Sequence, residues 1–518
     1  MFTMPSVKNR VQHAQEANEA RMQKELDDHV KNFNIHIDFP AKVESADGSS
    51  KPPRTNEDLI QHRLLEAGVL FEDLQTLGPL TESINKFVED LNRTQCFQFV
   101  KVFVDQKEQR QQRQRQGDQE INNQEELKQK QELRVVLKER NWYRLYMGGG
   151  IKHDATDIPA KANVETSLSF LNLTGHLDST LFSYSVDQAT NPTLRFVHER
   201  PFYCVWTPYS PLHDSILAQP QGSKTSMQWR AVMDTLDHEY TRSYKEVQRM
   251  VGMRLANVGH VAHPETSDQA FSYLDWSWTL RDVVPRRHEY MPYNMDASPQ
   301  VVAESGPSLK HSIVYEIRTN GTLVDNRQQP TDGKDMFFKC ELAGPPGTVG
   351  FIKAQGGVNV HQPINSFLAF HLSIQGGAMQ PLTFGGLCSQ SMVDRFYVGS
   401  GSIPRLRGFG PGGIGPRSSQ RGGSTSPGGD ALGGESYSLA TTAISMPIYQ
   451  QARLFTFASA GHCGPNPKWT ATRTSMGVGF HVGTPLGRLE ATYAVPLRYG
   501  SRDARQYVQA GVSFGYGY

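Results

Sequence analysis

The sequence predicts a mostly β protein whose larger part is a transmembrane antiparallel β-barrel of about 16 strands. Three observations lead to this fold class. From Trp142 to Tyr518, apolar residues alternate with small or polar residues, which is the period of a β-strand. Mean hydropathy is −0.51, and no apolar run approaches the length of about 18 residues that a transmembrane helix needs. A barrel strand faces lipid only at alternate positions, so low mean hydropathy is compatible with a membrane location.

The alternation is clearest at 368–374, 474–483 and 507–516. In 474–483, methionine, valine and phenylalanine fall on one face, and glycine, serine and histidine fall on the other. A soluble β-sandwich would also alternate. Two details favour a barrel: the polar face suits a wet lumen, and Tyr516 and Tyr518 gather at a strand end, where an interfacial girdle would lie. Residues 227–251 fit either a helix or a strand pair.

Ahead of the barrel, which we assign to 142–518, residues 1–33 read as a polar helical extension. Residues 34–140 predict one small α+β domain. Its expected elements are a strand at 34–38, a helix capped by Thr55 or Asn56, a helix from about Pro79, and strands at 97–104 and 133–138. Between these last strands, the insertion 105–131 contains 10 Gln in 27 residues and cannot bury a core. We interpret it as a solvated segment in preference to an RNA-binding tract.

Composition argues against several classes of function. The 53 Lys+Arg residues balance 52 Asp+Glu, so no net field attracts nucleic acid, and we expect no nucleic-acid partner. The five cysteines are odd in number and far apart, which argues against a disulfide framework or a zinc site. No nucleophile elbow, phosphate loop or HExxH motif is present. We expect no catalytic residue, metal or cofactor, and hence no enzyme.

The C-terminal third contains an ordered series of short motifs. They are DNRQQPT at 325–331 with Gly333, ELAG at 341–344, DRFYVG at 394–399, LRGF at 406–409, DALGG at 430–434, TPLG at 484–487 and YAVPL at 493–497. Taken together, this series resembles the bacterial and organellar BamA-like superfamily, whose signature tetrapeptide is Val/Ile/Leu-Arg-Gly-Phe/Tyr. The order of elements in 34–140 resembles a polypeptide-transport-associated (POTRA) domain of the same superfamily.

The resemblance implies a function and a location. A single such domain and an N-terminus without an apolar signal segment resemble the mitochondrial branch, the core subunits of the sorting and assembly machinery. That branch implies an insertase in the mitochondrial outer membrane. Its expected partners are unfolded β-barrel precursors, accessory subunits of the complex and membrane lipid. The alternative is a protein-translocating or solute-conducting outer-membrane channel of the same superfamily.

The glycine-rich segment 399–434 holds 13 Gly in 36 residues and by composition is a flexible loop or an Arg/Gly RNA-binding tract. The resemblance implies that it folds into the lumen and that its motif Leu406, Arg407, Gly408 and Phe409 contacts the inner wall. A buried guanidinium needs a carboxylate or other acceptors. The stretch that the family resemblance matches to this role, 457–461, is FASAG and has no acid. The partner of Arg407 therefore stays open.

The resemblance also implies a lateral gate at the seam between the first and last strands. The first strand would use Tyr143, Leu145, Met147, Gly148, Gly149 and Gly150, and the three glycines would weaken strand order. The last strand would use Gln509, Gly511, Phe514 and Tyr516, which resemble the mitochondrial β-signal of polar, glycine and two hydrophobic positions. A precursor strand could pair with the open edge.

A third class, a soluble enzyme with a β-sandwich, finds little support in the residues. His311, His371 and His481 fall on strand patterns without forming a ligand cluster. A lone strand histidine is more often a hydrogen-bonded wall residue than a metal ligand. We interpret all three as wall residues.

Overall fold

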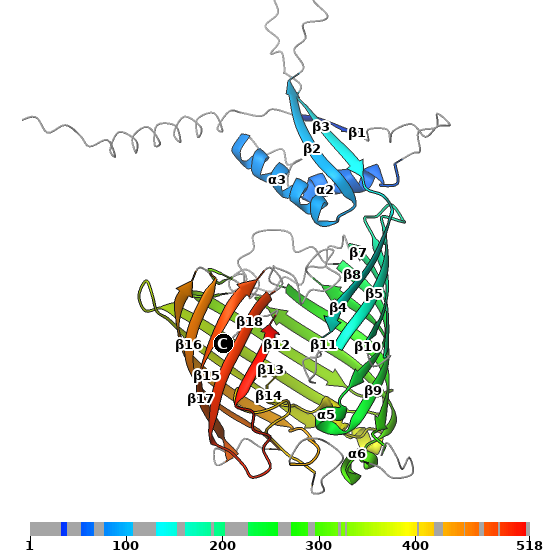
Figure 1. Cartoon of the computed structure of the whole chain (residues 1–518). Coiled ribbons are helices and arrows are strands. Elements are labelled where there is room, and N and C mark those ends of the chain that lie inside the picture. Colours follow the sequence, from blue (N-terminus) through cyan, green and yellow to red (C-terminus); the bar gives the residue numbers. More distant parts are fainter. Residues whose placement is uncertain are drawn as a thin grey trace, which may run out of the picture. The chain divides into compact units, whose positions relative to one another are not determined.

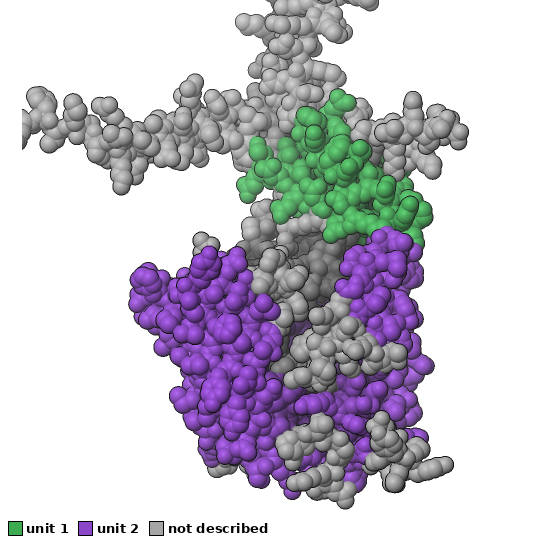
Figure 2. Space-filling view, in the orientation of Figure 1, with its two compact units in different colours: residues 1–144, 170–179 green, residues 145–169, 180–518 purple. Residues whose placement is uncertain are grey.

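The computed structural model describes residues 33–38, 53–66, 77–106, 131–152, 161–187, 191–201, 226–256, 271–287, 296–319, 323–326, 329–400, 404–418, 428–449, 451–465, 471–484 and 487–513. The chain divides into two compact units, which Figure 2 distinguishes by colour. Unit 1 comprises 1–144 and 170–179, and unit 2 comprises 145–169 and 180–518. Residues 142–144 and 170–179, which the sequence predicts to be part of the barrel, lie in unit 1.

The described part of unit 1 contains two helices and a three-stranded sheet. Its elements are β1 (Phe33–Asp38), α2 (Glu57–Glu66), α3 (Leu77–Arg93), β2 (Phe97–Gln106) and β3 (Gln131–Glu139), and the strand order is β1-β3-β2. The central strand β3 pairs in parallel with β1 and antiparallel with β2. The buried apolar side chains of this unit include Leu64 of α2, Phe87 and Leu91 of α3, and Leu133 and Val135 of β3.

The strands that flank the Gln-rich insertion are longer than expected. Pairing of Asp105 with Glu132 and of Gln106 with Gln131 continues the ladder. Three residues assigned to the insertion therefore belong to strands, because hydrogen bonding to a neighbouring strand extends both beyond their apolar stretches. The remainder of the insertion, 107–130, lies outside the described residues. Of the predicted extension 1–33, residues 1–32 lie outside them as well, and Phe33 is the first residue of β1.

Among the described residues, unit 2 is built on one sheet of sixteen strands, as expected, in the order of the chain (Figure 1). The strands are β4 (Tyr143–Lys152), β5 (Lys161–Leu171), β6 (Ser179–Asp187), β7 (Pro192–Pro201), β8 (Ser226–Asp237), β9 (Tyr244–Ala256), β10 (Phe271–Pro285), β11 (Gly306–Arg318), β12 (Gly333–Ala343), β13 (Phe351–Pro363), β14 (Ala369–Pro381), β15 (Ser436–Tyr449), β16 (Ala452–Gly464), β17 (Arg473–Thr484), β18 (Gly487–Arg498) and β19 (Val508–Ser513). Every pair whose register is described in this sheet is antiparallel, for example β10 with β11.

In the large sheet, many polar side chains are buried and many apolar side chains are exposed, which is the reverse of a soluble protein. On β10 the buried side chains include Asp275, Thr279 and Arg281, whereas Leu280 and Trp276 on the opposite face are each 44% exposed. A soluble protein removes its apolar side chains from water, so this arrangement fits a sheet whose outer face meets lipid and whose polar face lines a lumen. The same inversion holds on β17 and β18, where Phe480 and Leu489 are exposed.

Residues 227–251, which fitted either a helix or two strands, form most of β8 and β9, joined by the short helix α5 (Glu239–Arg242). A further short helix, α6 (Pro299–Ala303), lies between β10 and β11, and two 3-10 turns, η3 (Phe384–Gly386) and η4 (Met392–Asp394), lie in the long β14–β15 connection. None of the helices in the described ranges is both long and apolar enough to cross a membrane.

Placing a charge on the outer face tests the membrane assignment. Leu280→Arg exposes a guanidinium to lipid and is expected to destabilise the folded barrel by about 2–4 kcal/mol if it lies near the bilayer midplane. Leu280→Ala, which removes only apolar surface, should cost clearly less. Urea titration of the folded fraction in lipid vesicles measures both values. Equal, small effects of the two substitutions would contradict a lipid-facing Leu280.

A candidate functional site in the barrel lumen

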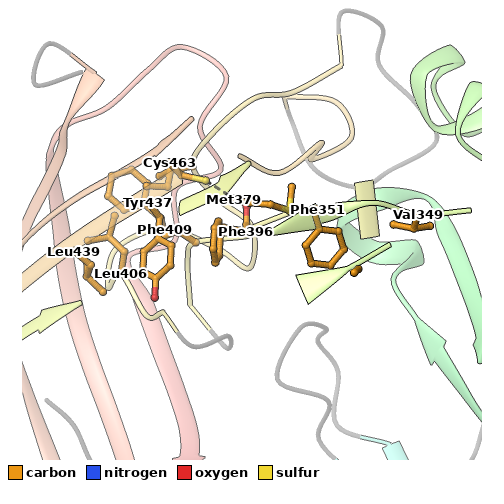
Figure 3. Packing of buried hydrophobic residues seen from close by; sticks show 12 residues of the cluster. Val349, Phe351, Met379, Phe396, Leu406, Phe409, Tyr437, Leu439 and Cys463 are labelled. Atoms are coloured by element: carbon orange, nitrogen blue, oxygen red, sulfur yellow. Dashed lines mark hydrogen bonds between the residues drawn. The ribbon is translucent and has the colours of Figure 1, made fainter. Parts of the chain in front are cut away.

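The connection between β14 and β15 packs against the inner wall through an apolar cluster. The loop contributes Phe396, Val398, Leu406, Phe409 and Ile414. The strands and their ends contribute Ala343, Val349, Phe351, Met379, Tyr437, Leu439 and Cys463, and Figure 3 shows how the side chains lie. Each fully buried aromatic ring in such a cluster stabilises the fold by ~1.5–3 kcal/mol. The loop is therefore an integral part of the lumen. We call this group the lumenal cluster.

Arg407 meets its carboxylate on β18. Its Nε and Nη2 lie 2.9 and 2.8 Å from Oε1 of Glu490, and both side chains are 1% exposed. The guanidinium also lies over the rings of Phe455 and Phe457 on β16, at 5.4 and 5.1 Å from the ring centroids. The stretch 457–461 therefore provides an aromatic ring but not the acid, which comes from a strand two positions further along the sheet.

Leu406 and Gly408, on either side of Arg407, pack closely against the inner wall because one residue of each contact is small. Gly408 has φ +89°, and a Cβ there would lie 3.1 Å from Cβ of Ser475. Ser475 in turn donates its hydroxyl to the carbonyl oxygen of Arg407 at 2.6 Å. Leu406 packs against Gly461, where an added Cβ would lie 3.2 Å from Cδ2 of Leu406. Glycine is needed at Gly408 because the positive φ disfavours other residues.

Glu490 neutralises more than one cation. Nη1 of Arg405 lies 3.4 Å from Oε1, and Nη2 of Arg488 lies 3.1 Å from Oε2. Removing the carboxylate would leave three guanidinium groups in the barrel interior without it. Leaving one buried charge unpaired costs about 3–5 kcal/mol. Glu490 is therefore the electrostatic centre of this contact, which we call the Arg407–Glu490 anchor.

A second ionic anchor lies nearer the start of the loop. Arg281 on β10 binds Asp394 in a bidentate pair, with Nη1–Oδ1 3.1 Å and Nη2–Oδ2 2.8 Å. Lys310 on β11 lies 3.3 Å from Asp394 and 2.8 Å from Glu341 on β12. Burial alone would raise the pKa of Asp394, but Lys310 and Arg281 outweigh it and lower that pKa. The carboxyl group is therefore ionised at neutral pH.

The end of the loop is fixed by Asp430. Its two carboxylate oxygens accept hydrogen bonds from the Ser243 hydroxyl at 2.6 Å and from the Ser298 backbone N–H at 2.8 Å. Ser243 follows α5 and Ser298 precedes α6, so Asp430 joins two other connections of the barrel to the loop. Sequence reasoning placed both Asp394 and Asp430 in motifs but gave neither a role.

The last strand and the residues just before it contact the same loop. Nε2 of Gln509 donates to the carbonyl oxygen of Phe409 at 3.0 Å. The backbone N–H of Gln506 donates to the carbonyl oxygen of Gly408 at 3.0 Å. Gln509, predicted as the polar position of the β-signal, therefore holds the tetrapeptide of the loop from the β19 side.

Gly511 is the one other predicted residue of the last strand that lies among the described residues. Gly511 lies in β19, and a Cβ added there would meet open space. Phe514 and Tyr516 lie outside the described residues.

The predicted first strand is β4, and it lies at the other end of the sheet from β19. Tyr143 and Met147 are 53% and 71% exposed, and Leu145 is exposed as well. Gly148, Gly149 and Gly150 all lie within the strand. Among the described residues no ladder joins β4 to β19, so each presents one edge without a strand partner there.

The three strand histidines have different direct contacts. His311 accepts a hydrogen bond from the indole N–H of Trp276 at 2.7 Å, His371 contacts His361 and Ser445, and the ring of His481 lies beside Phe455. In the part of the chain that the structure describes, no group of three His, Cys, Asp or Glu side chains could hold a metal ion.

A double-mutant cycle tests the Arg407–Glu490 anchor. Glu490→Gln leaves buried cations without their carboxylate and is expected to destabilise the barrel by about 3 kcal/mol or more, and Arg407→Met by a similar amount. The double variant should lose less than the sum, because the two side chains act as a pair. Thermal unfolding followed by gel mobility measures all three. Arg473→Gln, in the more exposed pair with Asp503, is the matched control and should cost less. Additive losses would contradict the pairing.

The sequence and the structure are similar to those of known proteins. The model of the Omp85 superfamily domain matches residues 222–518. The structure is similar to that of BamA from Haemophilus ducreyi lacking POTRA domains 1–3, with 15% identity, a TM-score of 0.62, and coverage of 93% of this chain and 84% of that chain. CdiB from Acinetobacter baumannii matches with 12% identity, a TM-score of 0.42, and coverage of 92% and 73%.

No curated protein matches the sequence. At this level of identity the likeness to BamA shows the fold, a mostly β chain with a sixteen-stranded antiparallel sheet. The family model covers more than half of the chain, including the lumenal loop and both of its ionic anchors. The protein therefore belongs to the Omp85 superfamily.

Proposed function

We propose that this protein folds β-barrel precursors and inserts them into the mitochondrial outer membrane through a lateral gate between β4 and β19. The observation that carries the proposal is the pair of strand edges at the seam. Backbone N–H and C=O groups without partners are costly in lipid, so such an edge is a template for another strand. A precursor strand that pairs with it gains the hydrogen bonds it lacks, which is β-augmentation.

The packed lumen supports insertion over conduction. The lumenal cluster and the two ionic anchors hold the β14–β15 connection against β10–β18 from inside the barrel. An open solute pore needs a wide polar passage, and this loop occupies part of it. The alternative function is protein translocation by the same fold, and the depletion experiment distinguishes it from insertion.

Several features support the mitochondrial branch. Unit 1 has the strand–helix–helix–strand–strand order of a POTRA domain, and the described residues contain one such domain ahead of β4. The pattern Gln509, Gly511, Phe514 and Tyr516 resembles the mitochondrial β-signal. Precursors in that membrane, accessory subunits of a sorting and assembly complex, and lipid are the proposed partners. The reaction needs no catalytic residue, because precursor folding supplies the free energy.

Depletion in the source cell tests the function. Without this protein, a radiolabelled porin precursor is expected to cross the outer membrane but to accumulate short of its mature assembled form, as followed by native gel electrophoresis. Precursors that enter the organelle's interior should be imported normally over the same period. If porin assembles normally and those precursors stall outside, the protein is a translocation channel and the insertase proposal is wrong.

Locking the seam tests the route. In a background without the five native cysteines, Leu145→Cys on β4 and Ala510→Cys on β19 are joined by a flexible bifunctional maleimide. Crosslinking is expected to abolish client insertion into vesicles, because a precursor can no longer enter between the strands. Val358→Cys with Ile374→Cys joins two strands that are already paired and should leave insertion intact. Normal insertion through the locked seam would refute the lateral gate.

A further inference from the structure

The connection between β5 and β6 is a braced turn that belongs to unit 1. The side-chain amide oxygen of Asn172 accepts a hydrogen bond from the N–H of Leu177 at 2.9 Å. A carboxylate oxygen of Asp178 accepts one from the N–H of Thr174 at 2.9 Å and one from its hydroxyl at 2.6 Å. Asn172, Leu177 and Asp178 are almost fully buried. Such a turn holds its shape and can act as a docking element.

The turn docks onto the segment that precedes α2. Nδ2 of Asn172 donates to the hydroxyl oxygen of Thr55 at 2.8 Å, and Nη1 of Arg54 donates to the carbonyl oxygen of Leu171 at 3.0 Å. The N–H of Asn56 donates to the carbonyl oxygen of Gly175 at 3.2 Å. A Cβ at Gly175, where φ is +81°, would lie 2.5 Å from the Arg54 carbonyl oxygen, so only glycine permits this approach.

Glu139, the last residue of β3, holds the other side of the contact. Its Oε1 accepts hydrogen bonds from the backbone N–H groups of Arg54 and Thr55 at 3.0 and 2.8 Å and from the Thr55 hydroxyl at 2.6 Å. Burial would raise the pKa of Glu139, but these hydrogen bonds and the charge of Arg54 outweigh it and lower that pKa. We call Arg54, Thr55, Glu139, Asn172 and Gly175 the clasp.

The clasp gathers three strand ends in one unit. β4 begins four residues after Glu139, β5 ends at Leu171 and β6 begins at Ser179. The N–H of Leu171 also donates to the carbonyl oxygen of Trp142 at 2.8 Å, and the rings of Trp142 and Phe170 stack at 5.6 Å. The start of β4 is thus tied to the β5–β6 turn as well as to β3.

We propose that Thr55, Glu139 and Asn172 are positioning residues that tie the first residues of β4 and the β5–β6 turn to the N-terminal domain, and that client insertion depends on this tie. The role in insertion rests on the proposed function, because it requires that the β4 edge receive the precursor. The mechanical part, a rigid connection of the β5–β6 turn to the domain, does not depend on that function.

Hydrogen exchange and client insertion together test the clasp on the full chain in vesicles. Thr55→Val with Asn172→Ala removes the hydroxyl and amide that join the turn to the domain. Loss of such buried hydrogen bonds is expected to raise the hydrogen-exchange rate of the backbone amides in 171–178 by about tenfold or more. Client insertion should slow while the thermal midpoint of the barrel stays unchanged, because the strand ladders are intact.

Two controls separate positioning from general damage. Thr55→Ser alone keeps the hydroxyl and the Asn172 amide, and it should retain both slow exchange and normal insertion. Asn191→Ala removes a comparable side-chain hydrogen bond, to Asp187 in the β6–β7 connection, and should change neither. Unchanged exchange in the double variant overturns the connection, and faster exchange with normal insertion overturns the positioning role. If the unaltered protein inserts no client, the proposed function fails, and exchange alone decides whether the clasp connects the turn to the domain.

Discussion

Every backbone N–H and C=O group in a membrane-spanning sheet needs a partner, because hydrocarbon provides none. Most of this protein follows from that requirement. Fifteen neighbouring pairs in the ordered sheet give its described strands backbone partners, and only the outer edges of β4 and β19 have no neighbouring strand in that order. Side chains then sort by face, with Leu280 and Phe480 outward and Asp275 and Arg281 inward. The edges are where the requirement is left unmet among the described ladders, and they are where we place the function.

A barrel of this kind has no single apolar core, so its interior must be held by other means. The β14–β15 connection provides them by combining apolar packing with charge. The lumenal cluster supplies buried area, while Asp394 and Arg407 fix two points of the loop to different parts of the wall. Buried ion pairs add specificity of position, since a displaced charge would lose its partner in a medium of low dielectric.

Sequence reasoning worked where the information is local. Alternation predicted the strands of the large sheet, since a strand's period is written in its own residues. The LRGF motif located Arg407 but not Glu490, because the acid lies 83 residues along the chain and meets Arg407 only when the β14–β15 connection packs against β18. The clasp was missed for the same reason: Asn172 and Thr55 are 117 residues apart. Residues 227–251 stayed ambiguous because their apolar residues fit two periods.

The shared carboxylate of Glu490 has a genetic consequence. Arg405, Arg407 and Arg488 all lie within 3.4 Å of it. A substitution that removes the Glu490 carboxylate would therefore take the same ionic partner from three guanidinium groups at once. A second-site change that removes one arginine would leave the others unneutralised. Suppressors of a Glu490 lesion should therefore be rare as single substitutions. They should more often introduce a new acid on a neighbouring strand, which makes this position resistant to stepwise evolutionary replacement.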